Sequence, residues 1–175
     1  MAVRVFVGVA SPYGNSSVLP YNKQFFSGGS NSLRAFQINS VGPGTYNQNA
    51  DSIIFMQLGG NIKLELNVES RFTIYRFLKG ALFVDMGNIW MQQSSPASIG
   101  EPFLTKAFIS ELAIGAGVGI RFDVSFFLLR FDLAMPLKKP WLDKGKRWVL
   151  DEINFGSSEW RTNNLILNVA IGYPF

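Results

Sequence analysis

The alternation that decides the fold runs through residues 111–135, ELAIGAGVGIRFDVSFFLLRFDLAM. Every second residue from Leu112 to Phe122 is apolar, while the positions between them hold alanine, glycine or a charged residue. The same period of two returns from Phe127 to Met135 after a short break. Alternate side chains of a β-strand point to opposite faces of its sheet. The stretch therefore predicts two adjacent strands, each with one apolar face and one mixed face.

Four further segments repeat this alternation. In each of them one face is uniformly apolar, and the other carries charged, small or glycine residues. These segments cover residues 3–10, 62–69, 81–87 and 165–175. No stretch shows a convincing helical period, so the sequence predicts an all-β chain of six strands.

Composition argues against a soluble protein and against most enzymes. Charged residues make up 16% of the 175 residues and apolar residues 47%, which leaves little charge for a water-facing surface. The chain has no cysteine and no histidine, which excludes disulfides, thiol nucleophiles, histidine-ligated zinc and Ser-His-Asp triads. No pair of carboxylates has a second catalytic group or a nucleophile at a recognisable spacing. We therefore expect no catalytic residue, no metal and no cofactor.

The connections favour a membrane barrel. Bacterial outer-membrane barrels have short periplasmic turns on one side and long loops on the other, and their strands need about 9–11 residues to span the bilayer. The sequence thus predicts an antiparallel transmembrane β-barrel, with a soluble β-sandwich as the alternative that period two leaves open. It also predicts an integral outer-membrane location with a periplasmic C-terminus. The gaps between predicted strands alternate between long and short: 11–61, 70–80, 88–110, 124–126 and 136–164.

Six strands are fewer than the eight of the smallest single-chain membrane barrels. An open sheet in lipid would leave unpaired backbone groups at two edges, which is costly. We therefore expect a portion of a larger barrel, or a chain that closes a barrel with other copies. A strand at the very N-terminus favours a portion of a larger barrel. Outer-membrane lipid and the remaining strands are the implied partners.

The net charge of +4 does not indicate nucleic-acid binding. Five of the 16 basic residues fall in residues 138–147, and the others are scattered singly. A protein that follows a phosphate backbone gathers its cations on one face with aromatic platforms. We predict no nucleic-acid partner and interpret residues 138–147 as a solvated loop.

The first long connection contains a Gly28–Gly29 pair and then the tetrad Leu33-Arg34-Ala35-Phe36. It resembles the long extracellular loop of the BamA/TamA superfamily of outer-membrane insertases and translocation pores, also called bacterial surface antigens. The hallmark of that loop is an apolar residue followed by Arg-Gly-Phe or Arg-Gly-Tyr, so Ala35 stands where glycine is usual. Further resemblances follow in the family's order, at residues 69–72, 81–90, 115–122 and 130–136 and at the final aromatic residue, Phe175.

This resemblance covers residues 1–175 and implies the last six strands of a barrel of about sixteen. The earlier strands and the periplasmic POTRA repeats are missing. The implied function is to insert unfolded outer-membrane proteins or to move polypeptide across the membrane. A weakly paired seam would open sideways and template incoming strands, with residues 165–175 as one lip. The alternative is a passive pore or surface antigen that binds an extracellular partner.

The resemblance also implies a loop lock formed by Arg34 and Phe36 with carboxylates on neighbouring strands. By parity, Glu69 and Asp85 point to the polar face, where they could meet an inward-folded arginine. A guanidinium offers a planar fork of donors suited to such carboxylates. The alternative is that Arg34 is a solvated loop charge and that both carboxylates face water.

The end of the chain carries the last predicted site. By parity Ile171, Tyr173 and Phe175 lie on the lipid-facing side of the final strand, as an aromatic girdle or as a signal read by the assembly machinery. Gly172 and Pro174 are expected to weaken pairing near the end of this strand, because proline donates no ladder hydrogen bond.

Overall fold

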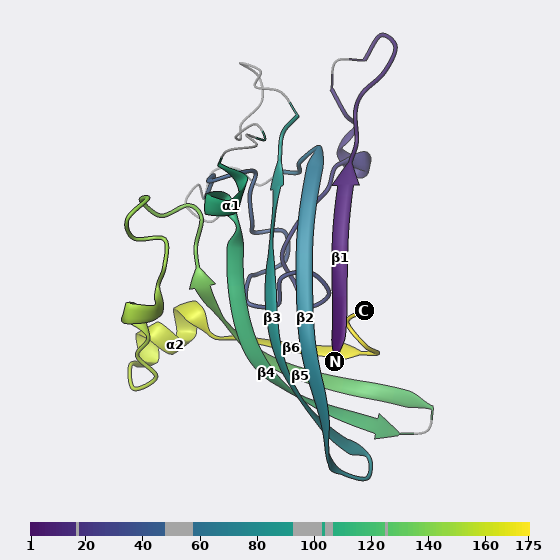
Figure 1. The fold of residues 1–175 in the computed structure, drawn as a ribbon, viewed down its shortest axis with the longest axis vertical. Helices are drawn as coiled ribbons and strands as arrows, with labels where there is room; N and C mark the ends of the chain where they lie inside the picture. The colour runs from purple at the N-terminus through teal and green to yellow at the C-terminus, as the bar shows by residue number, and fades with distance from the viewer. Residues whose placement is uncertain (17, 48–57, 93–102, 104–106, 125) are drawn as a thin grey trace.

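Six antiparallel strands dominate the computed structural model, which describes residues 1–16, 18–47, 58–92, 103, 107–124 and 126–175. Each strand pairs with the next along the chain in one sheet of order β1-β2-β3-β4-β5-β6 (Figure 1). The predicted all-β antiparallel sheet is therefore confirmed. The strands are β1 (Ala2–Val9), β2 (Ile62–Tyr75), β3 (Leu78–Trp90), β4 (Ala113–Val124), β5 (Phe127–Lys138) and β6 (Ile166–Ile171).

The sheet is inside out compared with that of a soluble protein. Its apolar side chains face outward, and Val5 of β1 and Leu167 of β6 are 66% and 64% exposed. The charged side chains at the centre of its other face are buried, and Glu65 and Arg121 have no exposed surface. In water the opposite arrangement is the rule. The outward side therefore fits hydrocarbon, and we call the buried polar side the inner face.

The connection between β2 and β3 is much shorter than predicted. Residues 70–80 were expected to form a turn, but the strands continue, and only Arg76 and Phe77 join them. The ladder persists through the pairs Arg71↔Ala81 and Phe72↔Gly80, because the alternation of polar and apolar residues does not stop at Glu69. The contrast between short turns and long connections is thus sharper than expected.

Two further strand ends differ from the prediction. Strand β5 runs beyond Met135 to Lys138, and Pro136 is accommodated opposite Gly115 beside a shift in register. Strand β6 ends at Ile171, whereas residues 165–175 were predicted. Gly172 makes the last bond, from its N–H to the Leu128 carbonyl at 2.8 Å, and its φ of +93° then turns the chain out of the strand.

Short helices flank the sheet although none was predicted. α2 begins after Ser157, whose Oγ accepts a hydrogen bond from the Trp160 N–H at 3.2 Å, a standard N-terminal cap. Among the described residues, none of the helices is long and apolar enough to cross a membrane. The helical segments are η1 (Tyr21–Lys23), α1 (Phe108–Glu111), η2 (Leu150–Glu152) and α2 (Ser158–Asn164).

The first long connection folds back over the sheet. Figure 1 shows it running across β2 and β3, while the strands turn progressively from an upright β1 to a nearly horizontal β6. Its tip, residues 27–36, is largely buried. Residues 17 and 48–57 of the predicted loop 11–61 lie outside the described residues. The loop tip therefore lies on the concave inner face instead of extending into solvent.

Candidate functional site

The loop tip (residues 27–36) makes hydrogen bonds to both edges of the sheet. Its Asn31 carbonyl accepts from Arg4 of β1 at 2.7 Å, and its Asn31 side chain accepts from Arg130 of β5 at 2.8 Å. The Arg34 carbonyl accepts from the Asn168 amide of β6 at 2.9 Å. A single short segment therefore ties together strands that lie far apart in the sheet.

Arg34 sits at the centre of this contact and is held by two carboxylates. Its Nε and Nη2 donate to the two oxygens of Asp85, each at 2.8 Å, and its backbone N–H donates to Asp85 Oδ2 at 3.1 Å. Its Nη1 donates to Glu69 Oε2 at 2.5 Å. All three side chains are at most 1% exposed. The structure thus brings together Arg34, Glu69 and Asp85 in a bidentate, charge-assisted arrangement.

An aromatic ring also contacts the Arg34 side chain. The guanidinium carbon lies 3.5 Å from the centre of the Phe83 ring, close enough for a strong cation–π contact. Burial opposes the charge of Arg34, but the hydrogen bonds and charges of Asp85 and Glu69 outweigh it and raise its pKa. Sequence reasoning did not assign Phe83 to the site, although it shares the inner face with Asp85 two residues later.

The Arg34 contact belongs to a larger buried cluster in which charges balance. Arg121 and Arg130 are direct cross-strand neighbours, an arrangement that is unfavourable for like charges. Arg121 donates to Asp132 at 2.5 Å and to Glu69 at 3.2 Å, and Arg130 lies 3.4 Å from Asp132. The charge cluster comprises three arginines and three carboxylates: Arg34, Arg121, Arg130, Glu69, Asp85 and Asp132.

A second anchor holds the start of the loop tip. Glu65 of β2 accepts hydrogen bonds from the hydroxyls of Ser27, at 2.9 Å, and Ser32. Lys63 lies 2.9 Å from the same carboxylate and also donates to the Phe26 carbonyl at 2.7 Å. Parity placed Glu65 on the inner face, but no pattern in the sequence indicated that two loop serines would reach it.

Ala35 fits the inner face because the strand opposite it has a glycine. A Cβ added at Gly115 of β4 would lie 2.2 Å from the Ala35 Cβ, well inside any permitted contact. The loop backbone therefore approaches β4 more closely than two side chains would allow. The alanine at the usual glycine position of the motif is tolerated because Gly115 supplies the space.

A swap of these two residues tests this close approach. We expect Gly115→Ala to weaken loop docking by about 1–3 kcal/mol, the usual range for overpacking, and Gly115→Ala combined with Ala35→Gly to restore most of the loss. Protection of residues 27–36 from hydrogen exchange measures docking. Ala116→Val, on the outward side of β4, is the matched control. Equal protection of residues 27–36 in Gly115→Ala and in the native protein would contradict the close approach of the loop tip to Gly115.

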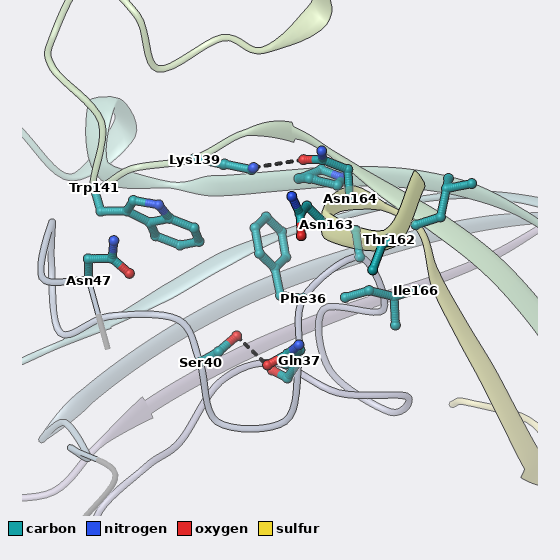
Figure 2. A pocket seen from close by; sticks show the side chains of 13 residues that line it. Phe36, Gln37, Ser40, Asn47, Lys139, Trp141, Thr162, Asn163, Asn164 and Ile166 are labelled. Atoms are coloured by element: carbon teal, nitrogen blue, oxygen red, sulfur yellow. Dashed lines mark hydrogen bonds between the residues drawn. The ribbon is translucent and has the colours of Figure 1, made fainter. Parts of the chain in front are cut away.

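Phe36 packs at the edge of a cavity of about 240 Å³ between the loop tip, the chain after β5 and α2. Figure 2 shows Phe36 and Trp141 side by side, and their rings meet edge to face with centroids 5.9 Å apart. Lys139 donates to the Asn164 side chain at 2.8 Å, and burial lowers its pKa. Phe36 therefore anchors the loop tip by apolar packing, one residue beyond the Ala35–Gly115 contact.

The basic segment at residues 138–147 is not a simple solvated loop. Lys138 and Arg147 are largely buried and donate hydrogen bonds of 3.0 Å to the Ile109 and Ser110 carbonyls. Cations at this end of α1 satisfy carbonyls that the short helix leaves unpaired. The interpretation of residues 138–147 as a solvated loop was therefore wrong for Lys138 and Arg147, which connect this segment to α1.

The residues predicted at the end of the chain are divided between the two faces. Ile171 remains outward at the end of β6 and is 78% exposed. Tyr173 and Phe175 do not continue the lipid-facing row, because Gly172 turns the chain toward Arg71 on the inner face. Their predicted place in a lipid-facing girdle is therefore corrected.

An outward apolar sheet with a buried, charge-balanced inner face and its own loop docked there defines a portion of a membrane β-barrel with an internal loop. The Omp85 superfamily domain matches residues 1–159, and the chain belongs to the Omp85 superfamily. The predicted family membership is thereby confirmed.

A relative in this family is the outer membrane protein assembly factor BamA of Neisseria meningitidis serogroup B (strain ATCC BAA-335 / MC58). The chain is 26% identical to it over 160 residues, which cover 81% of this chain and 20% of that protein. The chain therefore spans about a fifth of the length of the relative that it matches.

Proposed function

We propose that this chain is part of an integral outer-membrane barrel that inserts unfolded outer-membrane proteins or moves polypeptide across the membrane, without catalysing a chemical reaction. Family membership and the name of the Neisseria relative support this role. Its partners are outer-membrane lipid, the further strands that close the barrel, and unfolded client proteins. Its short turns and the end of β6 face the periplasm, and its long connections face outward.

The weak attachment of β6 carries the proposal. β5 has twelve residues, but β6 has six and pairs only with the stretch from Leu129 to Ala134. Within the described residues, the other edge of β6 pairs with no strand. Few ladder bonds make β6 the easiest of these strands to displace, and a displaced strand leaves an edge that can template another strand. β6 is thus one lip of a seam that opens sideways.

The docked loop tip confines opening to that seam. Through Arg34 it joins β2 and β3, and the charge cluster extends this network to β4 and β5. The described contact between the tip and β6 is the Asn168 amide bond to the Arg34 carbonyl. A neutral hydrogen bond costs far less to break than a buried, hydrogen-bonded ion pair. β6 can therefore detach while the other strands keep their register.

Crosslinking to a client tests the seam. A photoreactive amino acid at Leu167 on β6 is expected to capture an unfolded outer-membrane protein during its assembly in liposomes by the full-length protein. Val118 on β4 is the matched control, because it also faces outward, with 53% exposure against 64% for Leu167, but lies inside the sheet. A strand that templates by its edge crosslinks at least about tenfold more than an interior strand.

Equal capture at both positions, or capture at neither while the client still folds, would contradict the seam. Absence of any effect of the protein on client folding would favour the passive pore or surface antigen. That alternative would instead require a partner bound at the long connections.

A further inference from the structure

The cavity of about 240 Å³ beside Phe36 is formed by three segments that lie far apart in the sequence. The first long connection supplies Phe36 and Gln37. The chain after β5 supplies Lys139 and Trp141, and residues 162–166 supply the end of α2 and the start of β6. Figure 2 shows these side chains gathered around Phe36. Sites for drug-sized ligands have roughly 300–1,000 Å³, so an occupant of this cavity is smaller.

Two side-chain amides at this cavity are available to a ligand. Gln37 and Asn163 line it with exposed side chains, and neither side chain makes a hydrogen bond to another described residue. Each amide offers two N–H donors and an oxygen acceptor. The hydroxyls of Ser40 and Thr162 already donate to backbone carbonyls, so their oxygens remain as acceptors. The cavity therefore presents both donors and acceptors.

An aromatic surface lies beside these polar groups. Trp141 is half-buried, and its edge-to-face contact with Phe36 fixes the indole ring at the cavity. An indole held in this way offers a large, flat apolar surface at little cost in conformational entropy. A sugar ring packs the C–H groups of one face on such a surface, while its hydroxyls exchange hydrogen bonds with polar groups around it. The lining of this cavity matches both needs.

The charges at the cavity argue against an ion as its ligand. No carboxylate lines it within the described part of the chain, so nothing there balances a bound cation. The cation among the lining residues is Lys139, which already donates to the Asn164 side chain at 2.8 Å and whose pKa is lowered by burial. Burial thus disfavours the ammonium charge on which an anion would depend. A neutral ligand fits this lining best.

We propose that this cavity binds a single sugar ring, which packs on Trp141 and exchanges hydrogen bonds with Gln37 and Asn163. A free saccharide and the headgroup of an outer-leaflet glycolipid present the same ring chemistry. A ring bound here touches the first long connection, α2 and the start of β6 at once. It therefore adds to the Asn168 bond, the described contact between the loop tip and β6, and holds the start of β6 more firmly.

Saturation-transfer NMR on the full-length protein, in a detergent without a sugar headgroup, tests the site. The probes are D-glucose, D-galactose and N-acetyl-D-glucosamine, and sorbitol is the control because it carries hydroxyls without a ring. We expect at least one of the sugars to bind saturably with a dissociation constant of about 1–10 mM, as the ligand efficiency of so small a molecule allows. Sorbitol should not bind saturably, and inorganic phosphate should not displace the sugar.

Two variants assign the sugar to this cavity. Trp141→Ala removes the stacking surface and should weaken binding at least about tenfold, and Asn163→Ala removes one or two hydrogen bonds and should weaken it about threefold to tenfold. Trp148→Ala and Asn22→Ala are the matched controls, because both residues are exposed and neither lines the cavity. Heat-modifiable mobility in gels verifies folding. If Trp141→Ala does not fold, the exposed Asn163 keeps the test decisive.

Hydrogen exchange tests the hold on β6 and the source of the ring. A sugar at twice its dissociation constant should slow exchange of residues 165–171 about threefold in the native protein, and less in Asn163→Ala. The same measurement in lipid nanodiscs, with and without lipopolysaccharide, separates the two sources. Slower exchange with lipopolysaccharide assigns the ring to a glycolipid headgroup, and equal exchange assigns it to a free saccharide.

The proposal is overturned if none of the three sugars binds saturably, if sorbitol binds as tightly as they do, or if phosphate displaces them. It is also overturned if the folded variants bind as tightly as their controls. Binding without slower exchange of residues 165–171 refutes the hold on β6. None of these measurements involves a client, so their failure leaves the proposed function intact, and a failure of client assembly leaves the sugar site intact.

Discussion

Arg34→Ala releases the loop tip from the inner face, with an expected loss of about 3–5 kcal/mol of docking free energy. The change removes the hydrogen bonds from the guanidinium to Asp85 and Glu69 and leaves both carboxylates buried and uncompensated. It also removes the cation from the Phe83 ring. Hydrogen exchange of residues 27–36 should accelerate by at least about a hundredfold, while the strands of the sheet stay protected.

Arg34→Lys is not expected to restore docking. A lysine has a single ammonium group and cannot donate in parallel to both oxygens of Asp85 while it reaches Glu69. The control is Arg161→Ala, which removes an exposed arginine of α2 whose hydrogen bonds go to the carbonyls of Phe155 and Gly156. If residues 27–36 exchange no faster in Arg34→Ala than in Arg161→Ala, the contacts of Arg34 are not what holds the loop tip on the inner face.

Glu69→Gln has the second large effect, and it acts on the sheet more than on the loop. Glu69 accepts from Arg34, Arg71 and Arg121, so its neutralisation leaves three arginines of the charge cluster facing two carboxylates. We expect about 3–5 kcal/mol of destabilisation, seen as an earlier loss of heat-modifiable mobility in detergent. Asp85→Asn should release the loop tip with less effect on the strands, because the contacts of Arg121 and Arg71 with Glu69 survive.

A second change that restores neutrality separates the charge from the packing. Glu69→Gln combined with Arg121→Gln leaves two arginines against two carboxylates, so part of the lost stability should return. Glu159→Gln, at an exposed position of α2, is the control for the loss of a carboxylate. A double variant that is as unstable as the sum of its single changes would mean that charge balance is not the cause.

The strands and their faces could be predicted because period two is a local property of the sequence. The residues at which the strands end could be predicted less accurately. The alternation continues past Ser70, but it does not show by itself how far the two strands stay paired, and the ladder goes on to Tyr75. At the other end, Gly172 was expected only to weaken pairing. Its positive φ instead moves Tyr173 from the outward row to the inner face.

The candidate site could be predicted only in part, for a similar reason. Arg34 followed from the resemblance, and Glu69 and Asp85 followed from parity on their own strands. Parity does not give the register between strands or the path of the loop. The opposition of Asp85 and Gly115, which brings Ala35 against β4, became visible only once the strands were paired.

The charge balance of the inner face has a consequence for its hydration. Without Arg34, the charge cluster holds two arginines and three carboxylates, a net charge of one negative unit. Lifting the loop tip therefore exchanges an internal counter-charge for water and mobile cations. Such ions screen an exposed charge more effectively as ionic strength rises. Higher ionic strength is therefore expected to favour the lifted loop tip and a hydrated inner face.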